Sequence, residues 1–535
     1  THNFTVNRRA VSVSGTRLYD ATTNAVASDL STHANLVGSE TLNLSGTGTI
    51  ASKNVGSNKT VSVGTLALAD GSNGGLAANY TLSGGTHQLT VNQRPLNATL
   101  ARQYDGTTTA AGSTLSSFDA LQGGETLTMT GSGTAASANV ANGIAMSSNG
   151  TLALADGTGL ASNYSLNSTV INIAQRVLNS SGSKTYDANT DALAGAITLS
   201  NLVSGEALNH SGTATISSAN AGSYTITNLS GISIADGSGG TASNYTLTGG
   251  THNFTINQRP LAATIARQYD GTKTAAGSDL SSFDALQGGE TLTLSGSGTV
   301  GDENVANGQD VTLGSLALVN GTGLASNYSL NSASLNITKR VLNSSGSKTY
   351  DANTDALAGA ITLSNLVSGE ALNHSGTATI SSANAGSYTI TNLSGISIAD
   401  GSGGTASNYT LTGGTHNFTV NRRAVSVSGT RLYDATTNAV ASDLSTHANL
   451  VGSETLTLSG TGTIASKDVG SNKTVSVGTL ALGNGSNGGL AGNYTLSGGT
   501  HQLTVNQRPL NATLARQYDG TTASAGSTLS SFDAL

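Results

Sequence analysis

The fold of this protein is decided by a short motif that occurs seven times. It reads RLYDATT at 17–23 and 431–437, RQYDGT at 102–107, 267–272 and 516–521, and KTYDANT at 184–190 and 348–354. By subtraction, successive Tyr residues of the motif are 85, 82, 83, 81, 83 and 85 positions apart. Self-similarity at a fixed period indicates a repeat architecture, and it overrides the domain count that 535 residues would otherwise suggest.

Other marks keep the same step along the chain. A Glu follows each Tyr-Asp pair after about 20 residues, an Asn-Tyr pair after about 60, and an Arg ends each copy. These marks predict six full repeats, at 10–94, 95–176, 177–259, 260–340, 341–423 and 424–508. Residues 1–9 resemble the tail of a preceding repeat, and residues 509–535 resemble the first part of a seventh. We therefore expect the chain to be a window on a longer array.

The repeats fall into three types, which we call A (RLYDATT), B (RQYDGT) and C (KTYDANT). Their order along the chain is A-B-C-B-C-A-B. The two C repeats are almost identical over about 80 residues, which indicates recent duplication. No two neighbours share a type, and such alternation disfavours the strand swapping to which identical neighbouring domains are prone.

Each repeat has the pattern of short strands separated by turns. In the first repeat, Val11 and Val13 alternate with Ser12 and Ser14, and Gly, Asn, Asp and Ser clusters separate the later apolar pairs. Alternation with period two is typical of half-buried strands, and about six strands in 83 residues predict a small antiparallel β-sandwich, Ig-like in architecture. The alternative is a β-solenoid, because Leu44, Val63 and Leu82 are 19 positions apart.

The joins between repeats are short. Only Gln93, Arg94 and Pro95 separate the expected last strand of repeat 1 from the first strand of repeat 2. So few residues cannot behave as a flexible linker. We expect the modules to stack end to end as a stiff rod on the order of 200 Å long, with the junction Arg bonded to groups of both modules. The junction residues are Arg94, Arg176, Arg259, Arg340, Arg423 and Arg508.

Composition excludes several function classes. The chain carries 22 basic and 29 acidic residues, a formal charge of −7, which disfavours a protein that tracks nucleic-acid phosphates. It has no Cys, which removes thiolate metal sites and cysteine nucleophiles. No apolar run reaches the length of a membrane span. The His residues have no recurring Ser or carboxylate partner, so we expect surface strand histidines and no catalysis: His87, His210, His252, His374 and His501.

The Tyr-Asp pairs are expected to be structural marks. The ring should fill the core near a strand end with its hydroxyl bonded to a backbone group, and the carboxylate should accept N–H bonds from the turn. The pairs are Tyr19-Asp20, Tyr104-Asp105, Tyr186-Asp187, Tyr269-Asp270, Tyr350-Asp351 and Tyr433-Asp434. No cofactor is expected. The alternative is a calcium site that uses Asp20, Glu40 and Asp70, although Asn320 and Asn484 replace Asp70 in other repeats.

The recurring [RK]-x-Y-D-[GA]-x-T motif, followed by GGETL or VSGEAL and then ASNY, resembles the YDG-type repeat of large bacterial surface proteins. Such repeats occur in filamentous haemagglutinin-like adhesins exported by two-partner secretion. The resemblance covers the whole chain and implies an extracellular, β-rich stalk without catalytic residues. Type A repeats read YDA where the motif has YDG, which departs from the turn glycine.

Two functions follow as expectations. The first is a structural stalk or filament segment of a secreted adhesin or biofilm matrix fibre, at the bacterial cell surface. Its partners are the neighbouring repeats of the same longer chain and other copies of itself in a fibre. The second is a multivalent array in which repeated faces each bind extracellular polysaccharide weakly.

Overall fold

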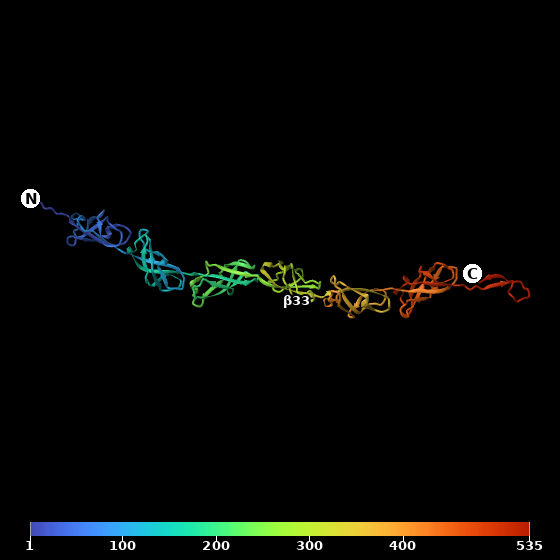
Figure 1. Ribbon diagram of the computed structural model, residues 1–535. Coiled ribbons are helices and arrows are strands. Elements are labelled where there is room, and N and C mark those ends of the chain that lie inside the picture. The colour runs from blue at the N-terminus through green and yellow to red at the C-terminus, as the bar shows by residue number, and fades with distance from the viewer. Residues whose placement is uncertain (1, 534–535) are drawn as a thin grey trace. The chain divides into compact units, whose positions relative to one another are not determined.

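The computed structural model describes residues 2–533, and these residues form β-strands joined by turns, with no α-helix among them. The chain divides into two compact units, Thr1–Arg259 with Ser326–Tyr328, and Pro260–Ala325 with Ser329–Leu535. Repeats 1 to 3 lie in the first unit, and most of repeat 4 lies with repeats 5 and 6 in the second. Figure 1 shows that the strands of each repeat gather in a body of their own.

Repeat 1 contains ten strands. They are β1 (Arg9–Ala10), β2 (Ser12–Leu18), β3 (Asn24–Val26), β4 (Thr32–Ala34), β5 (Leu42–Ser45), β6 (Thr47–Ile50), β7 (Gly56–Ser62), β8 (Ala67–Asp70), β9 (Tyr80–Thr81) and β10 (Gln88–Asn92). Six of them form a sheet in the order β3-β6-β7-β10-β2-β4, while β5 pairs with β8 and β1 with β9. All pairs join strands of one repeat, so tandem β modules are confirmed and no coil of about 20 residues is found among the described residues.

The order is kept in repeats 2 and 3. Repeat 2 consists of β11 (Arg94–Gln103), β12 (Thr109–Ala111), β13 (Leu115–Phe118), β14 (Leu127–Thr130), β15 (Ser132–Ala135), β16 (Ala141–Ser148), β17 (Ala153–Asp156) and β18 (Tyr164–Ala174). Repeat 3 consists of β19 (Arg176–Val177), β20 (Asn179–Thr185), β21 (Asp191–Leu193), β22 (Ile197–Ser200), β23 (Leu208–Ile216), β24 (Gly222–Asn228), β25 (Ile232–Asp236), β26 (Tyr245–Thr246) and β27 (His252–Asn257). Their main sheets run β12-β15-β16-β18-β11-β13 and β21-β23-β24-β27-β20-β22.

The second unit repeats the B, C and A patterns. Repeat 4 has β28 (Arg259–Gln268), β29 (Thr274–Ala276), β30 (Leu280–Phe283), β31 (Leu292–Ser295), β32 (Ser297–Thr299), β33 (Ala306–Asp310), β34 (Ala317–Asn320) and β35 (Tyr328–Thr338). Repeat 5 has β36 (Arg340–Val341), β37 (Asn343–Thr349), β38 (Asp355–Leu357), β39 (Ile361–Ser364), β40 (Leu372–Ile380), β41 (Gly386–Asn392), β42 (Ile396–Asp400), β43 (Tyr409–Thr410) and β44 (His416–Asn421).

Repeat 6 and the residues after it complete the described chain. Repeat 6 has β45 (Arg423–Ala424), β46 (Ser426–Leu432), β47 (Asn438–Val440), β48 (Thr446–Ala448), β49 (Leu456–Ser459), β50 (Thr461–Ile464), β51 (Gly470–Ser476), β52 (Ala481–Asn484), β53 (Tyr494–Thr495) and β54 (Gln502–Asn506). Beyond it, β55 (Ala512–Ala515) and β56 (Thr528–Phe532) form an exposed hairpin, and Tyr518 of the seventh motif is 97% exposed.

The sheets are not purely antiparallel, which corrects the expected antiparallel sandwich. The last long strand of repeat 1, β10, runs parallel to β2, with Gln88 opposite Ser14 and Asn92 opposite Leu18. The same parallel pair recurs as β11–β18, β20–β27, β37–β44 and β46–β54. Because β2 and β10 run in one direction, the chain leaves the module at the end where β2 finishes. The Tyr-Asp motif therefore stands at the exit, and the Tyr19 amide donates to the Asn92 carbonyl.

A tight apolar core holds each module. In repeat 1, Val13 of β2, Leu89 of β10 and Leu42 of β5 are buried in one cluster, so the β5–β8 pair covers the main sheet. Gly15 permits the closest approach, because a Cβ there would lie 1.7 Å from the carbonyl oxygen of Asp29. Only glycine fits such a contact with neighbouring backbone.

Candidate functional site: the junction between repeats

The Tyr-Asp turn is fixed from within its own repeat. Asp20 Oδ1 accepts the Thr22 amide at 2.9 Å, as in an Asx-turn, and Arg17 donates to Asp20 Oδ2 at 2.6 Å. Arg17 also donates to the carbonyl oxygens of Thr22 and Asn24, and its side chain is only 6% exposed. In type C repeats a Lys replaces this Arg, as in the pair Lys184–Asp187 at 2.8 Å. The turn thus presents the Tyr in a set orientation at the end of the module.

The residue after Tyr-Asp lies in the left-handed region. The φ angle is 77° at Gly106 and 75° at Gly271, and it is 62° at Ala21 and 64° at Ala188. The glycine of the YDG form therefore relieves a conformation that costs an L-residue about 1–2 kcal/mol. Types A and C keep the turn despite the alanine because the hydrogen bonds of the Asp hold it.

The Tyr of one repeat bonds to the Glu of the next. Tyr19 is fully buried, and its hydroxyl donates to Glu125 Oε1 at 2.6 Å, whereas the expected partner was a backbone group. Tyr164, from the Asn-Tyr pair of repeat 2, donates to Glu125 Oε2 at 2.9 Å. The two rings meet edge to face with centroids 5.3 Å apart. One carboxylate therefore joins two tyrosines that come from different modules.

Three further junctions, two of them in the second unit, repeat this arrangement. Each Glu accepts both hydroxyls at 2.6 to 2.7 Å, and the ring centroids are 5.3 to 5.5 Å apart. The groups are Tyr104–Glu206–Tyr245, Tyr269–Glu370–Tyr409 and Tyr350–Glu454–Tyr494. Three sequence marks that lie far apart in a repeat thus meet at one place, and we call this set the Tyr–Glu–Tyr cluster.

The Asn beside the second Tyr adds two bonds across the junction. Asn163 is 1% exposed, accepts the Val55 amide at 2.9 Å and donates to Asn54 Oδ1 at 3.0 Å. Equivalent pairs are Asn244 with Asn139, Asn408 with Asn304 and Asn493 with Asn384. The sequence reasoning missed the accepting Asn, although its signal is visible as Asn-Val or Asn-Ala, which recurs with the repeat period.

The junction Arg reaches both neighbours at three junctions. Arg176 donates to the Tyr104 carbonyl of repeat 2 at 3.5 Å, and to the carbonyl and Oδ1 of Asn201 in repeat 3 at 2.6 and 2.8 Å. Arg340 and Arg423 make the same kind of pair, with Tyr269 and Asn365 and with Tyr350 and Asn449. Arg94 donates to the Tyr19 carbonyl at 2.7 Å and Arg259 to the Tyr186 carbonyl at 3.4 Å, while Arg508 is exposed.

By strand pairing the junction Arg belongs to the module that follows it. Arg94 begins β11 and lies opposite Tyr164, and Arg176 begins β19 and lies opposite Tyr245. The backbone thus passes from one sheet to the next within one or two residues. A joint of this length has no room for a flexible segment.

The apolar cores also continue through the junctions. Leu96, Leu127 and Tyr164 of repeat 2 are buried in the core cluster of repeat 1. Leu178 and Tyr245 of repeat 3 belong in the same way to the cluster of repeat 2, and the cores of repeats 5 and 6 form one cluster. Buried apolar area stabilises by about 25 cal/mol per Å². Adjacent modules in a unit are therefore held by core packing as well as by polar bonds.

Burial and hydrogen bonding keep the phenols of the cluster protonated. Burial, with the hydrogen bond to Glu206, raises the pKa of Tyr245 to about 12. Burial and the equivalent carboxylates raise the pKa to about 12 at Tyr409 and Tyr494. At Glu125, burial favours the protonated acid, but bonds from Lys53, Tyr19 and Tyr164 outweigh it and lower the pKa. The cluster is thus a carboxylate with two neutral phenol donors.

The carboxylates of the calcium alternative have separate roles. Asp70 Oδ1 accepts the Ala77 amide at 2.7 Å, and Asn484 Oδ1 accepts the Ala491 amide at 2.9 Å. An amide oxygen serves as well as a carboxylate there, which explains the exchange of Asp for Asn between repeats. Glu40 accepts the Tyr80 hydroxyl, and Asp20 is held by Arg17. Residues 2–533 contain no group of three His, Asp or Glu side chains that could hold a metal ion.

The prediction that the histidines lie on the surface is partly wrong. His87, His252 and His501 are 5 to 6% exposed, and each ring makes hydrogen bonds inside its module. His252 Nδ1 lies 2.9 Å from Ser180 Oγ, and its Nε2 lies 2.8 Å from the Leu247 carbonyl. His210 and His374 are half-buried against backbone carbonyls. The rings of His87, His252 and His501 fasten the turn before the last strand, which the strand pattern alone could not reveal.

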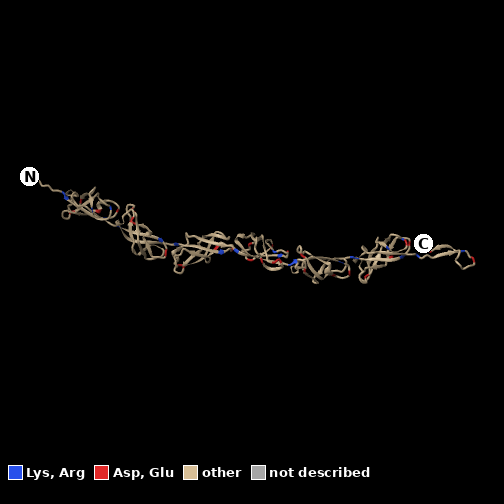
Figure 2. Ribbon diagram, in the orientation of Figure 1, with Lys and Arg blue, Asp and Glu red and all other residues tan. Residues whose placement is uncertain are grey.

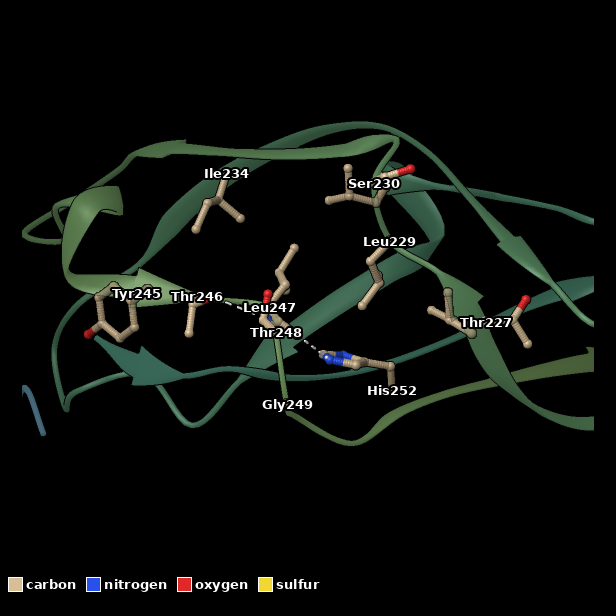
Figure 3. Close-up of a pocket in the computed structure, with 12 residues that line it drawn as sticks. Thr227, Leu229, Ser230, Ile234, Tyr245, Thr246, Leu247, Thr248, Gly249 and His252 are labelled. Atoms are coloured by element: carbon tan, nitrogen blue, oxygen red, sulfur yellow. Dashed lines mark hydrogen bonds between the residues drawn. The ribbon is translucent and has the colours of Figure 1, made fainter. Parts of the chain in front are cut away.

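Both type C repeats have a hollow beside the histidine that begins their last strand, His252 in repeat 3 and His416 in repeat 5. In repeat 3 it has a volume of about 630 Å³, and the side chains of Leu229, Ile234 and Leu247 line it beside Thr246 and Thr248 (Figure 3). In repeat 5 the corresponding residues, among them Leu393, Ile398 and Leu411, line a hollow of about 540 Å³. No charged side chain lines either hollow.

Comparisons with known proteins agree with the repeat period. The chain matches the YDG domain over residues 5–88, 86–171, 174–252, 255–336, 333–417 and 415–503, and it therefore belongs to the YDG domain family. A comparison with curated protein sequences gave no match. No helix in residues 2–533 could cross a membrane.

Two solved structures are distantly similar. One is the crystal structure of Drosophila N-cadherin EC1-4, at 9% identity over 60% of this chain and 93% of that chain, with a TM-score of 0.11. The other is the crystal structure of Down Syndrome Cell Adhesion Molecule isoform 1.30.30, N-terminal eight Ig domains, at 10% identity over 79% of this chain and 62% of that chain, with a TM-score of 0.11. Likenesses at these TM-scores say nothing about function.

Proposed function

We propose that this array of YDG domains is a stiff spacer, which acts by length and by the rigidity of its joints rather than by catalysis. The observation that carries the proposal is the Tyr–Glu–Tyr cluster, which joins neighbouring modules in the same way at four junctions. A spacer needs joints that resist bending, and a buried cluster with a continuous core supplies that resistance.

The setting of this function rests on family resemblance. We propose that the chain is a stalk or filament segment of a large secreted bacterial adhesin of the filamentous haemagglutinin type, or of a biofilm matrix fibre. Its place is then extracellular or at the cell surface. The composition supports this role, because charged residues are sparse along the ribbon (Figure 2) and the outward strand positions carry mainly Thr, Ser and Asn.

Distance measurements on the whole chain test the spacer function. The chain has no Cys, so pairs of introduced cysteines can carry spin labels in repeats 2 and 3 without interference. We expect a narrow distance distribution across this junction and a maximum dimension on the order of 200 Å in small-angle scattering. Arg176→Ala should broaden the distribution while circular dichroism stays that of folded modules. A broad distribution in the wild-type chain would exclude the spacer function.

A second candidate function is weak, multivalent binding of neutral polysaccharide. The paired hollows of repeats 3 and 5 favour it, because they combine aliphatic walls, hydroxyl groups and the volume of a small ligand. Titration of the chain with neutral glucans, with Leu247→Trp and Leu411→Trp blocking the two hollows, tests this function. Binding that survives the double substitution would place the ligand elsewhere.

A further inference from the structure

One position at each junction differs in charge between repeats. It is the residue directly before the Asn that accepts the cross-junction bond, so its place is fixed by that bond. The position holds Lys53 in repeat 1, Ala138 in repeat 2, Glu303 in repeat 4 and Ala383 in repeat 5. We call it the gate position. Charged residues are only 10% of the chain, so a charge at a recurring contact site is distinctive.

At the first junction the gate residue contacts the Tyr–Glu–Tyr cluster. Lys53 Nζ lies 2.6 Å from Glu125 Oε1, the oxygen that also accepts the Tyr19 hydroxyl, and 5.9 Å from the centroid of the Tyr19 ring. The Glu125 side chain is 8% exposed and that of Lys53 is 43% exposed. A nearly buried carboxylate without a counter-charge is costly, and a cation that contacts it offsets part of that cost.

Three other junctions lack this cation. Within residues 2–533, no ion pair is found to Glu206, Glu370 or Glu454, and each accepts its two phenols alone. At the junction of repeats 4 and 5 the gate residue is itself acidic. Glu303 there precedes Asn304, and its carboxylate lies 3.5 Å from Lys273 of its own repeat. The junction of repeats 4 and 5 thus contains two negatively charged side chains, Glu303 and Glu370.

We propose that the gate position determines how strongly each module holds the one that follows, by supplying, omitting or opposing a cation for the buried Glu. The proposal rests on the spacer function and names what sets the strength of each joint. Each full repeat carries the Glu, and a Lys gate before it strengthens the joint. A Glu gate weakens it. Both type A repeats carry Lys, at 53 and 467, and in both cases a type B sequence follows.

The chain contains its own matched comparison. The junctions of repeats 2–3 and 4–5 both lead from a type B to a type C repeat, and the type C repeats are almost identical. Their gates are Ala138 and Glu303. Repeats 2 and 4 also differ near the gate, at Ser137 against Asp302 and at Thr108 against Lys273, so substitutions at the gate position are needed to isolate its effect.

The experiment uses the full chain with one spin-label pair across a single junction at a time. Raising the salt from about 0.01 M to about 1 M shortens the screening length from about 30 Å to about 3 Å. We expect the distance distribution across junction 1–2 to broaden with salt, and Lys53→Ala to broaden it at low salt and remove the salt response. The open population should rise roughly two- to fivefold, as for one partly exposed ion pair. Junction 2–3 should not respond to salt.

The reciprocal substitution keeps the test independent of folding defects. Glu303→Lys should narrow the distribution across junction 4–5 and give it the salt response of junction 1–2, which a damaged variant could not do. An unchanged salt response in Lys53→Ala, or no narrowing in Glu303→Lys, would overturn the gate. Broad distributions at every junction, with or without the substitutions, would instead overturn the spacer function.

Discussion

The hydroxyl of Tyr19 lies 2.6 Å from Oε1 of Glu125, 106 positions further along the chain and in the next module. The tyrosine that gives the repeat its most recognisable motif therefore serves the joint as well as its own core. The neighbouring Asp20 and Arg17 hold the turn, and Glu125 and Tyr164 receive the ring. Each repeat that carries these residues can therefore form the same joint with its neighbour. The period of the motif in the sequence is thus also the spacing of the joints along the chain.

Removing the Tyr104 ring should affect two modules. We expect Tyr104→Ala to lower the free energy of unfolding by about 3–5 kcal/mol, because a large buried ring leaves a cavity. Tyr104→Phe should cost about 1–3 kcal/mol, because it removes only the bond to the Glu206 carboxylate. Denaturant unfolding of the chain measures both. A melt unchanged by Tyr104→Ala would contradict the buried position.

The cross-junction Asn should not tolerate a carboxylate. Asn244 donates to Asn139 Oδ1 at 2.9 Å, so Asn244→Asp would set two acceptors against each other. We expect a loss of about 1–3 kcal/mol, seen as separate unfolding of repeats 2 and 3 in calorimetry. Asn79, at the same place in repeat 1, is exposed. Asn79→Asp is the control, and its effect should stay within about 0.5 kcal/mol.

Glycine after the Tyr-Asp pair should stabilise the type C repeats. Ala188 is exposed and has a φ of 64°, so Ala188→Gly removes strain and loses no contact. We expect a gain of about 0.5–1 kcal/mol in thermal unfolding. The reverse change, Gly106→Ala, should destabilise, because its Cβ would also lie 2.9 Å from Val203 Cγ1 of the next repeat. If Ala188→Gly and Gly106→Ala changed the free energy of unfolding in the same direction, strain at this turn position would be contradicted.

Alkaline pH should loosen the joints, because it deprotonates the phenols that donate to the buried Glu. The pKa of Tyr245 and of Tyr494 is raised from 10.0 to about 12 by burial and by the bonded Glu. A pKa above the unfolded value gives a stabilisation that is complete below pH 10 and is lost as the pH rises through 12. Phenolate absorbance should therefore develop together with the loss of tyrosine near-ultraviolet dichroism. Phenolate that forms before any loss of structure would contradict burial of the hydroxyls.

The Asp that begins the Gly-rich turn should act through one oxygen, without a metal. Asp236 Oδ1 accepts the Ala242 amide at 2.7 Å, as Asn320 does for Ala325 in repeat 4. Asp236→Asn should therefore be neutral within about 0.5 kcal/mol, and Asp236→Ala should cost about 1 kcal/mol. Chelator or added calcium should leave the melting temperature unchanged. A rise with calcium that Asp236→Asn removes would reinstate the metal site.

Local patterns were sufficient to predict the modular β architecture. The period of the Tyr-Asp motif, the alternation of Val11 and Val13 with serines, and the Gly-rich turns predicted tandem β modules, because strand alternation and turn chemistry depend on neighbours in sequence. The short segment from Gln93 to Pro95 likewise predicted a joint without a flexible linker. Each of these features depends on the chain within a few residues.

Pairing between distant strands decided the rest. The parallel pair of β2 and β10 could not be deduced from either strand, since the same alternation suits a parallel or an antiparallel neighbour. That pairing brings Tyr19 to the exit of its module. There Tyr19 can bond to Glu125 of the next module, and Asn54 can bond to Asn163. The sequence by itself thus determined the repeat and its strands. The tertiary structure alone decided that the recurring Tyr, Glu and Asn form one cluster, because strand direction and module stacking bring together residues more than 100 positions apart.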